Sequence, residues 1–78
     1  MVLVYEYARL SWRMEKSTGN EIVEVFFIRT GKTRTYNTMS EGINDLASLG
    51  FRMITYQFGE WENNQFIQVA VFERLVND

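Results

Sequence analysis

The sequence contains no cysteine and no histidine. Disulfide bridges and metal sites, which often support very small domains, therefore lack their common ligands here. The same absences remove the usual general base near neutral pH and the thiolate nucleophile. We therefore expect no metal, no cofactor and no enzymatic activity. The carboxylate pairs Glu41/Asp45 and Glu60/Glu62 are interpreted as solubilising charge.

A surplus of charge of one sign is also missing. Eight basic residues stand against ten acidic ones, for a net charge of −2. Such a balance creates no long-range field that would attract nucleic acid or an anionic membrane. No segment approaches the ~20 consecutive apolar residues of a membrane span. We expect a cytoplasmic protein without a membrane partner.

Apolar residues are abundant for a chain of this size. The 78 residues are 46% hydrophobic and 15% aromatic. A chain this short forms one domain, covering residues 1–78, with a thin core. Its apolar surface exceeds what one helix could cover. The composition therefore predicts a homo-oligomer, most simply a dimer, in which a second copy supplies the missing burial.

A two-residue alternation in the first third of the chain predicts two strands. The first runs from Val2 to Met14 and the second from Glu21 to Arg29, with a Gly19-Asn20 turn between them. We expect these strands to pair antiparallel. The polar segment 29–36 fits either a loop or a short hairpin that folds back onto the second strand.

A helix is predicted to follow, starting at Thr38 and ending at Gly50. Thr38 and Glu41 have the spacing of a capping box, and glycine favours the left-handed position after a helix. The predicted buried stripe consists of Met39, Ile43, Leu46 and Ala47.

Two further alternating segments, 51–61 and 65–76, predict a second hairpin with a turn at Asn63-Asn64. In the first of them, Phe51, Met53, Thr55 and Gln57 are expected on one face. The expected fold is α+β, in the order β-β-α-β-β, with a four-stranded, mainly antiparallel sheet and the helix on one face.

The segment Ile43–Ile54 resembles the signature Leu-Asn-Glu-Leu-Gly-x-x-Gly-Trp-Glu-Leu-Val of a small prokaryotic family known as domain of unknown function 4177. Segments 5–7 (Tyr-Glu-Tyr) and 71–74 (Val-Phe-Glu-Arg) are similar to the family's first and last strands. The chain departs from the signature at Ala47, Leu49 and Phe51. The resemblance implies a glycine-capped helix followed by an aromatic that packs under it, and it implies no known activity.

Two functional hypotheses follow from the remaining residues. The first is a non-enzymatic interaction module that self-associates through its sheet, with another, unidentified protein as a further partner. Its interface candidates are the strand aromatics Tyr5, Tyr7, Trp12, Tyr56, Phe58, Trp61 and Phe66.

The second hypothesis is a binder of single-stranded nucleic acid or of a small nucleotide-like anion. Its candidate contacts are Arg29, Lys32, Arg34 and Tyr36, in the basic segment 29–36. We favour the first hypothesis because a nucleic-acid-binding sheet normally also has a basic surround, which the acidic total does not provide.

Overall fold

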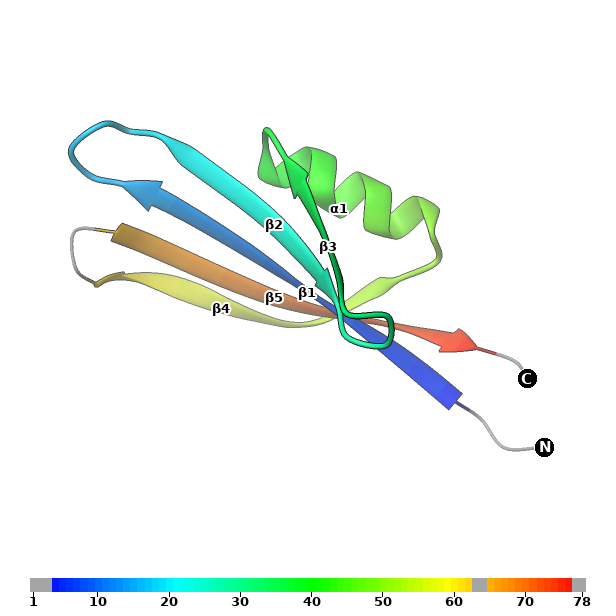
Figure 1. Ribbon diagram of the computed structural model, residues 1–78. Coiled ribbons are helices and arrows are strands. Elements are labelled where there is room, and N and C mark those ends of the chain that lie inside the picture. The colour runs from blue at the N-terminus through cyan, green and yellow to red at the C-terminus, as the bar shows by residue number, and fades with distance from the viewer. Residues whose placement is uncertain (1–3, 63–64, 77–78) are drawn as a thin grey trace.

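The computed structural model describes residues 4–62 and 65–76, which form one helix and five strands (Figure 1). The elements are β1 (Val4–Glu15), β2 (Glu21–Phe27), β3 (Lys32–Tyr36), α1 (Met39–Ser48), β4 (Arg52–Glu62) and β5 (Gln65–Val76). The strands form a single sheet in the order β3-β2-β1-β5-β4, and all neighbours are antiparallel. The α+β class and both predicted hairpin pairings are confirmed.

The prediction of four strands in the order β-β-α-β-β is wrong, because segment 29–36 contains the extra strand β3. Gly31 adopts a positive φ of 72°, and its N–H donates to the carbonyl of Phe27 at 2.8 Å. This tight turn places Lys32 opposite Phe27 and Tyr36 opposite Val23. The order is therefore β-β-β-α-β-β, with β3 at one edge of the sheet.

Helix α1 begins and ends as the sequence predicts. The Thr38 hydroxyl accepts the N–H of Glu41 at 3.2 Å, and the Glu41 carboxylate accepts the N–H of Asn37 at the same distance. Gly50, just past the helix, has φ 90°, which costs little without a β-carbon. At the start of the helix, one of the otherwise unpaired first N–H groups, that of Glu41, is bonded by the N-cap side chain.

The predicted buried stripe of α1 needs one correction. Leu46 is fully buried and Met39 and Ile43 pack against the core, but Ala47 is exposed and the helix residue buried beside Leu46 is Gly42. The helix packs mainly against β1, β2 and β3. Side chains two positions apart on a helix point in nearly opposite directions. Asp45 contacts Tyr36 of β3, so Ala47 faces away from β3.

The core lies between α1 and one face of the sheet. It consists of Ala8, Leu10, Val23, Val25, Leu46, Phe51, Ala70 and Phe72. Strand alternation sends the intervening residues of β1, β2 and β5 to the opposite face. Phe51 is buried just after the helix, and its ring centroid lies 6.0 Å from that of Phe27. The expectation that an aromatic residue after the glycine packs into the core is confirmed.

Strand β4 does not alternate regularly, contrary to the prediction for residues 51–61. Its register against β5 shifts between Met53 and Thr55 and again between Gln57 and Glu60. As a result Met53 and Tyr56, which pair with Phe72 and Ala70, share the helix side of the sheet. The predicted turn at Asn63-Asn64 lies outside the described residues.

The molecule is elongated, measuring 51 × 20 × 19 Å. Figure 1 shows the strands extending well past the helix at one end. The accessible surface is 5529 Å², compared with about 5,000 Å² expected for a compact monomer of this mass. No helix among the described residues is long and apolar enough to cross a membrane.

Candidate functional site

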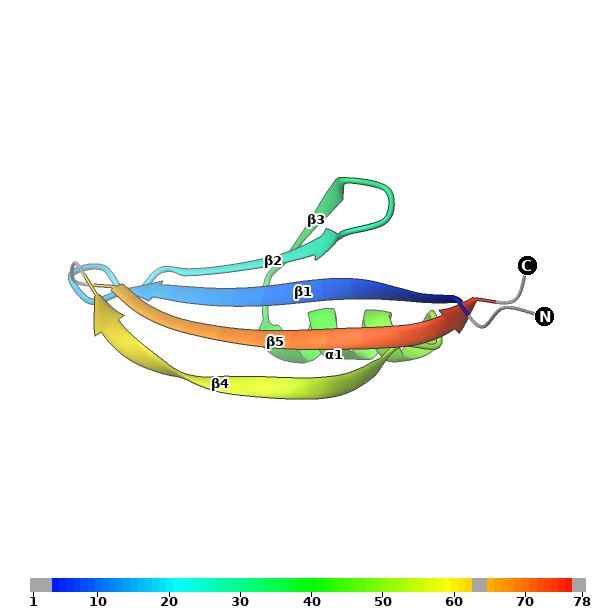
Figure 2. The same ribbon diagram turned by 90° about the horizontal axis from the view of Figure 1, so that it is seen from below.

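The face of the sheet opposite α1, here called the open face, is covered by no other element of the described chain. Figure 2 is seen from this side, with β1 and β5 in front of the helix. The register places Tyr5, Tyr7, Arg9, Ser11 and Arg13 of β1 on this face, since the intervening Ala8 and Leu10 are buried under α1.

Apolar side chains dominate the middle of the open face. Tyr5, Tyr7, Ile22 and Leu75 are between 39% and 47% exposed. Half-buried Phe26, Val69 and Val71 lie between them, because they pair with Arg9, Ser11 and Arg9 of the central strand. These seven residues give the open face an apolar surface across β2, β1 and β5, which Arg9, Ser11, Glu24 and Glu73 interrupt.

Charged side chains on the open face are mostly neutralised within it. Arg13 contacts Glu24 at 3.2 Å, and Arg52 contacts Glu73 at 2.8 Å. Hydrogen bonds to Glu73 raise the pKa of Arg52 above its ordinary value. Arg9 instead lies over the ring of Phe26, 5.7 Å from its centroid.

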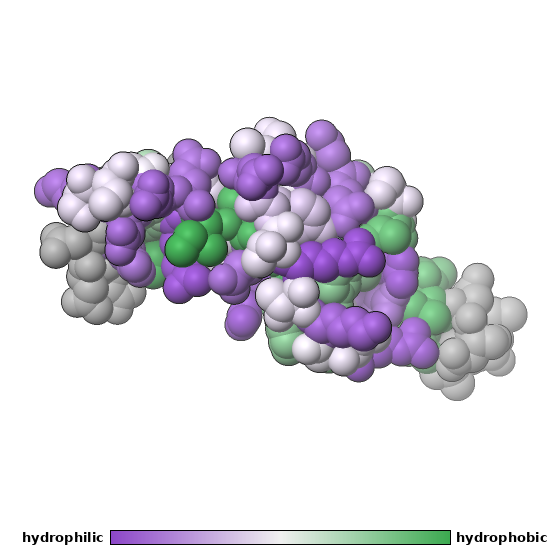
Figure 3. Space-filling model, turned by 45° about the horizontal axis from the view of Figure 1, so that its top comes forward, coloured by the Kyte–Doolittle hydropathy of each residue, from purple (hydrophilic) through white to green (hydrophobic). Residues whose placement is uncertain are grey.

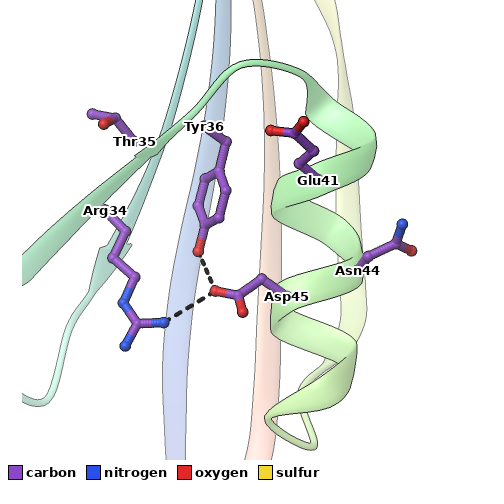
Figure 4. Close-up of a pocket in the computed structure, with 6 residues that line it drawn as sticks. All are labelled: Arg34, Thr35, Tyr36, Glu41, Asn44 and Asp45. Carbon is purple, nitrogen blue, oxygen red and sulfur yellow. Dashed lines mark hydrogen bonds and ion pairs between the residues drawn. The ribbon is translucent and has the colours of Figure 1, made fainter.

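A polar groove lies on the other side of the molecule, between β3 and α1 (Figure 4). The Tyr36 hydroxyl donates to the Asp45 carboxylate, and Arg34 Nη1 lies 3.0 Å from the same oxygen. The groove has a volume of about 680 Å³ and is also lined by Thr35, Glu41 and Asn44.

Mutual hydrogen bonding fixes the protonation of this groove. The bond from Tyr36, followed by Arg34, lowers the pKa of Asp45. Burial, together with the bond to Asp45, raises the pKa of Tyr36, and proximity to both partners raises the pKa of Arg34. Asp45 is therefore ionised and Tyr36 neutral at ordinary pH, and the lowered pKa makes the Asp45 carboxylate a weaker base than a free one.

A second ionic cluster joins the end of the helix to β1 and β5. Glu6 is only 8% exposed and accepts a hydrogen bond from Arg74, while Arg29 lies 3.5 Å away. Arg74 also donates to the Leu49 carbonyl at 2.6 Å and lies over the Phe51 ring. This cation at the helix C-terminus stabilises the helix dipole and fixes α1 to the sheet.

The four predicted anion contacts do not form one site. Lys32, Arg34 and Tyr36 share the helix side of β3, whereas Arg29 lies in the Glu6 cluster. Arg34 and Arg29 are both paired with carboxylates.

The seven predicted interface aromatics are divided between the two faces. Tyr5 and Tyr7 lie on the open face, while the register places Trp12, Tyr56 and Phe66 on the helix side. Trp12 and Phe66 make an edge-to-face contact with ring centroids 5.6 Å apart. The side chains of Phe58 and Trp61 lie outside the described part.

Sequence reasoning missed the aliphatic centre of the open face and the Glu6–Arg74 pair. Val71 lies between two buried residues along its strand, and Val69 and Phe26 each have one buried neighbour, so apolar residues on both faces of β2 and β5 were the available signal. Glu6 interrupts an otherwise apolar alternating row in β1, which indicates a buried charge that needs a partner.

The two sides of the molecule differ in surface character. In Figure 3, where the helix side comes forward, the surface is mostly hydrophilic and its hydrophobic residues form small separate patches. The open face carries seven exposed or half-buried apolar residues, and we take it as the candidate functional site.

Comparisons with protein-family models, curated proteins and solved structures found no match to this chain. The resemblance to domain of unknown function 4177 therefore stays a prediction.

Proposed function

We propose that this chain is a non-enzymatic interaction module that self-associates through the open face of its sheet. The observation that carries the proposal is the group of apolar side chains Phe26, Val69 and Val71 on the open face, beside exposed Tyr7 and Leu75. Homodimer interfaces are richer in apolar surface than the rest of a protein's surface.

The two edges of the sheet are poor sites for association. Strand β3 is only five residues long and presents Lys32 and Arg34, and β4 has two register shifts. Short strands, cations and bulges are the devices that prevent edge-to-edge pairing. The open face is thus the better surface for a second copy.

The available area also suits a dimer. Strands β1 and β5 have 12 residues each, and a sheet residue occupies roughly 16 Å² of each face. The five strands therefore present on the order of 700 Å² per copy, close to the ~800 Å² per partner of a standard stable interface.

The matched test compares two tyrosines of equal exposure on opposite faces. Tyr7, on the open face, is 39% exposed, and Tyr56, on the helix side, is 41% exposed. Light scattering coupled to size-exclusion chromatography should give a mass near twice 9.3 kDa for the wild type and for Tyr56→Lys. Tyr7→Lys should weaken association at least ~10-fold and shift the mass toward 9.3 kDa, because it buries an ammonium group in the interface.

Two outcomes would contradict the proposal. One is a wild-type monomer at tens of micromolar. The other is a dimer that Tyr56→Lys dissociates and Tyr7→Lys leaves intact, which would place the interface on the helix side. Circular dichroism of each variant checks that the fold is retained.

The nucleic-acid or nucleotide-binding alternative has less support. Two of its three cationic contacts, Arg29 and Arg34, are neutralised by Glu6 and Asp45. A phosphate backbone would have to compete with both carboxylates. Salt-sensitive binding of a fluorescent single-stranded oligonucleotide that is lost in Arg34→Ala would favour this alternative.

A further inference from the structure

Arg9 is unusual among the arginines of the described chain. Arginines 13, 29, 34, 52 and 74 each contact a carboxylate, whereas Arg9 has no ion pair among the described residues. Its guanidinium lies over the Phe26 ring, and Val71 pairs with it on the other side. The one uncompensated arginine thus lies in the middle of the apolar surface proposed to bind a second copy.

An unpaired charge in this position opposes association unless the partner neutralises it. Burying an ionised side chain without a counter-charge is costly, and an aromatic ring offsets only part of that cost. A second copy must therefore bring a carboxylate to Arg9. The open face offers three described carboxylates: Glu15 at the far end of β1, and Glu24 and Glu73, which lie nearer to Arg9 in the register.

Glu24 is the better of the two nearer carboxylates. Arg13 contacts only one of its carboxylate oxygens, Oε1, at 3.2 Å, and its side chain is 37% exposed. Glu73 is 14% exposed and accepts hydrogen bonds from Nε and Nη2 of Arg52, at 3.3 and 2.8 Å. Both Arg52 contacts reach Oε1 of Glu73, so each glutamate keeps one oxygen without a described contact. Glu24 is the more accessible of the two and holds one intrachain hydrogen bond, whereas Glu73 holds two.

The positions of Arg9 and Glu24 suit a two-fold interface. Glu24 lies on β2 and pairs with Ser11, which is two residues from Arg9 along β1. The side chains of Arg9 and Glu24 therefore lie one row apart near the centre of the open face. When two identical faces pack together about a two-fold axis in the interface, a contact from Arg9 to the other copy's Glu24 occurs twice.

We propose that reciprocal Arg9–Glu24 ion pairs between two copies set the register of the dimer and select a second copy of this chain as the partner. This inference rests on the proposed self-association. Buried or half-buried ion pairs of this kind commonly fix register more than they add affinity.

The test is a charge-swap series measured by sedimentation velocity over a dilution series. Arg9→Glu and Glu24→Arg should each weaken the dimer at least ~100-fold, since each places like charges opposite one another. The double variant Arg9→Glu/Glu24→Arg should recover to within ~10-fold of the wild-type dissociation constant. The control Arg34→Ala removes an arginine that pairs with a carboxylate on the helix side, away from the open face, and should change association less than ~3-fold.

Failure of the double variant to recover association would overturn the inference, as would a wild-type dissociation constant for Arg9→Glu. If Tyr7→Lys dissociates the dimer and the swap series does not respond in this way, the self-association stands and the Arg9–Glu24 pairing is wrong. If the wild type binds an oligonucleotide as a monomer and Arg9→Glu abolishes that binding, Arg9 meets a phosphate and not a second copy. Thermal unfolding of every variant confirms that each remains folded.

Discussion

Replacing Gly42 by alanine tests how closely α1 packs on the sheet. A β-carbon at this position would lie 2.9 Å from Leu10 Cδ1, 3.4 Å from Tyr36 Cδ2 and 3.6 Å from Val23 Cγ1. Leu10 is fully buried, so it has little space into which its methyl group can move. Alanine gains about 1 kcal/mol of helix propensity over glycine, but overpacking a tight core costs about 1–3 kcal/mol.

We therefore expect Gly42→Ala to lower the free energy of unfolding by about 1 kcal/mol and Tm by roughly 4–8 °C. Denaturant unfolding at one fixed protein concentration is the assay, because association would otherwise change apparent stability. Asn44→Ala is the control: it lies on the same helix, is exposed, and should be neutral or slightly stabilising. A Gly42→Ala variant as stable as the wild type would refute the close approach of α1 to Leu10.

Two further predictions concern the ionic groups. Arg74→Met should lower the free energy of unfolding by about 2 kcal/mol, because it leaves the buried Glu6 carboxylate with Arg29, 3.5 Å away, as its remaining described cation. Arg29→Met removes the partner that is 56% exposed and should cost less than half as much in the same denaturation assay. Asp45→Asn should lower Tm near pH 7, and the difference from wild type should shrink below about pH 4. The reason is that the Tyr36 bond lowers the pKa of Asp45, so the stabilisation by the ionised Asp45 carboxylate is lost as the pH falls through that pKa. A pH-independent difference would contradict the second prediction.

Local signals in the sequence were sufficient for α1 and its surroundings. The Thr38–Glu41 spacing determines the start of the helix because the Thr38 hydroxyl bonds the N–H of Glu41, and the Glu41 carboxylate bonds the N–H of Asn37 just before the cap. Gly50 determines its end for an equally local reason, a positive φ. Pattern reading identified these features because each depends on residues within four positions of one another.

Features that depend on distant residues were not predictable in the same way. Strand β3 is polar because it is an edge strand, so its composition matches that of a loop. The exposure of Ala47 follows from the lateral position of α1 over β1, β2 and β3. The bulges of β4 were hidden because a shift of one residue changes faces without changing composition.

The candidate site shows the same limit. The number of aromatics predicted surplus apolar surface, but only the register shows that Tyr7 and Tyr56 lie on opposite faces. The basic segment 29–36 was interpreted as one patch. In the structure Arg29 pairs with Glu6 of β1 and Arg34 pairs with Asp45 of α1, so the two arginines lie in different ionic clusters. Charge density along a sequence does not reveal which charges are compensated in space.

Strands β2 and β5 provide the strongest physical argument for a second copy. Each carries apolar residues on both faces: Val25 is buried under α1 and Phe26 faces away, and Ala70 and Val71 repeat the pattern. Strands that are apolar on both faces are typical of sheets covered on both sides. One cover is α1, and no other element of the described chain reaches the open face. In the proposed self-association a second copy supplies the other cover, and the Arg13–Glu24 and Arg52–Glu73 pairs within each chain reduce the charge that the two faces present to each other.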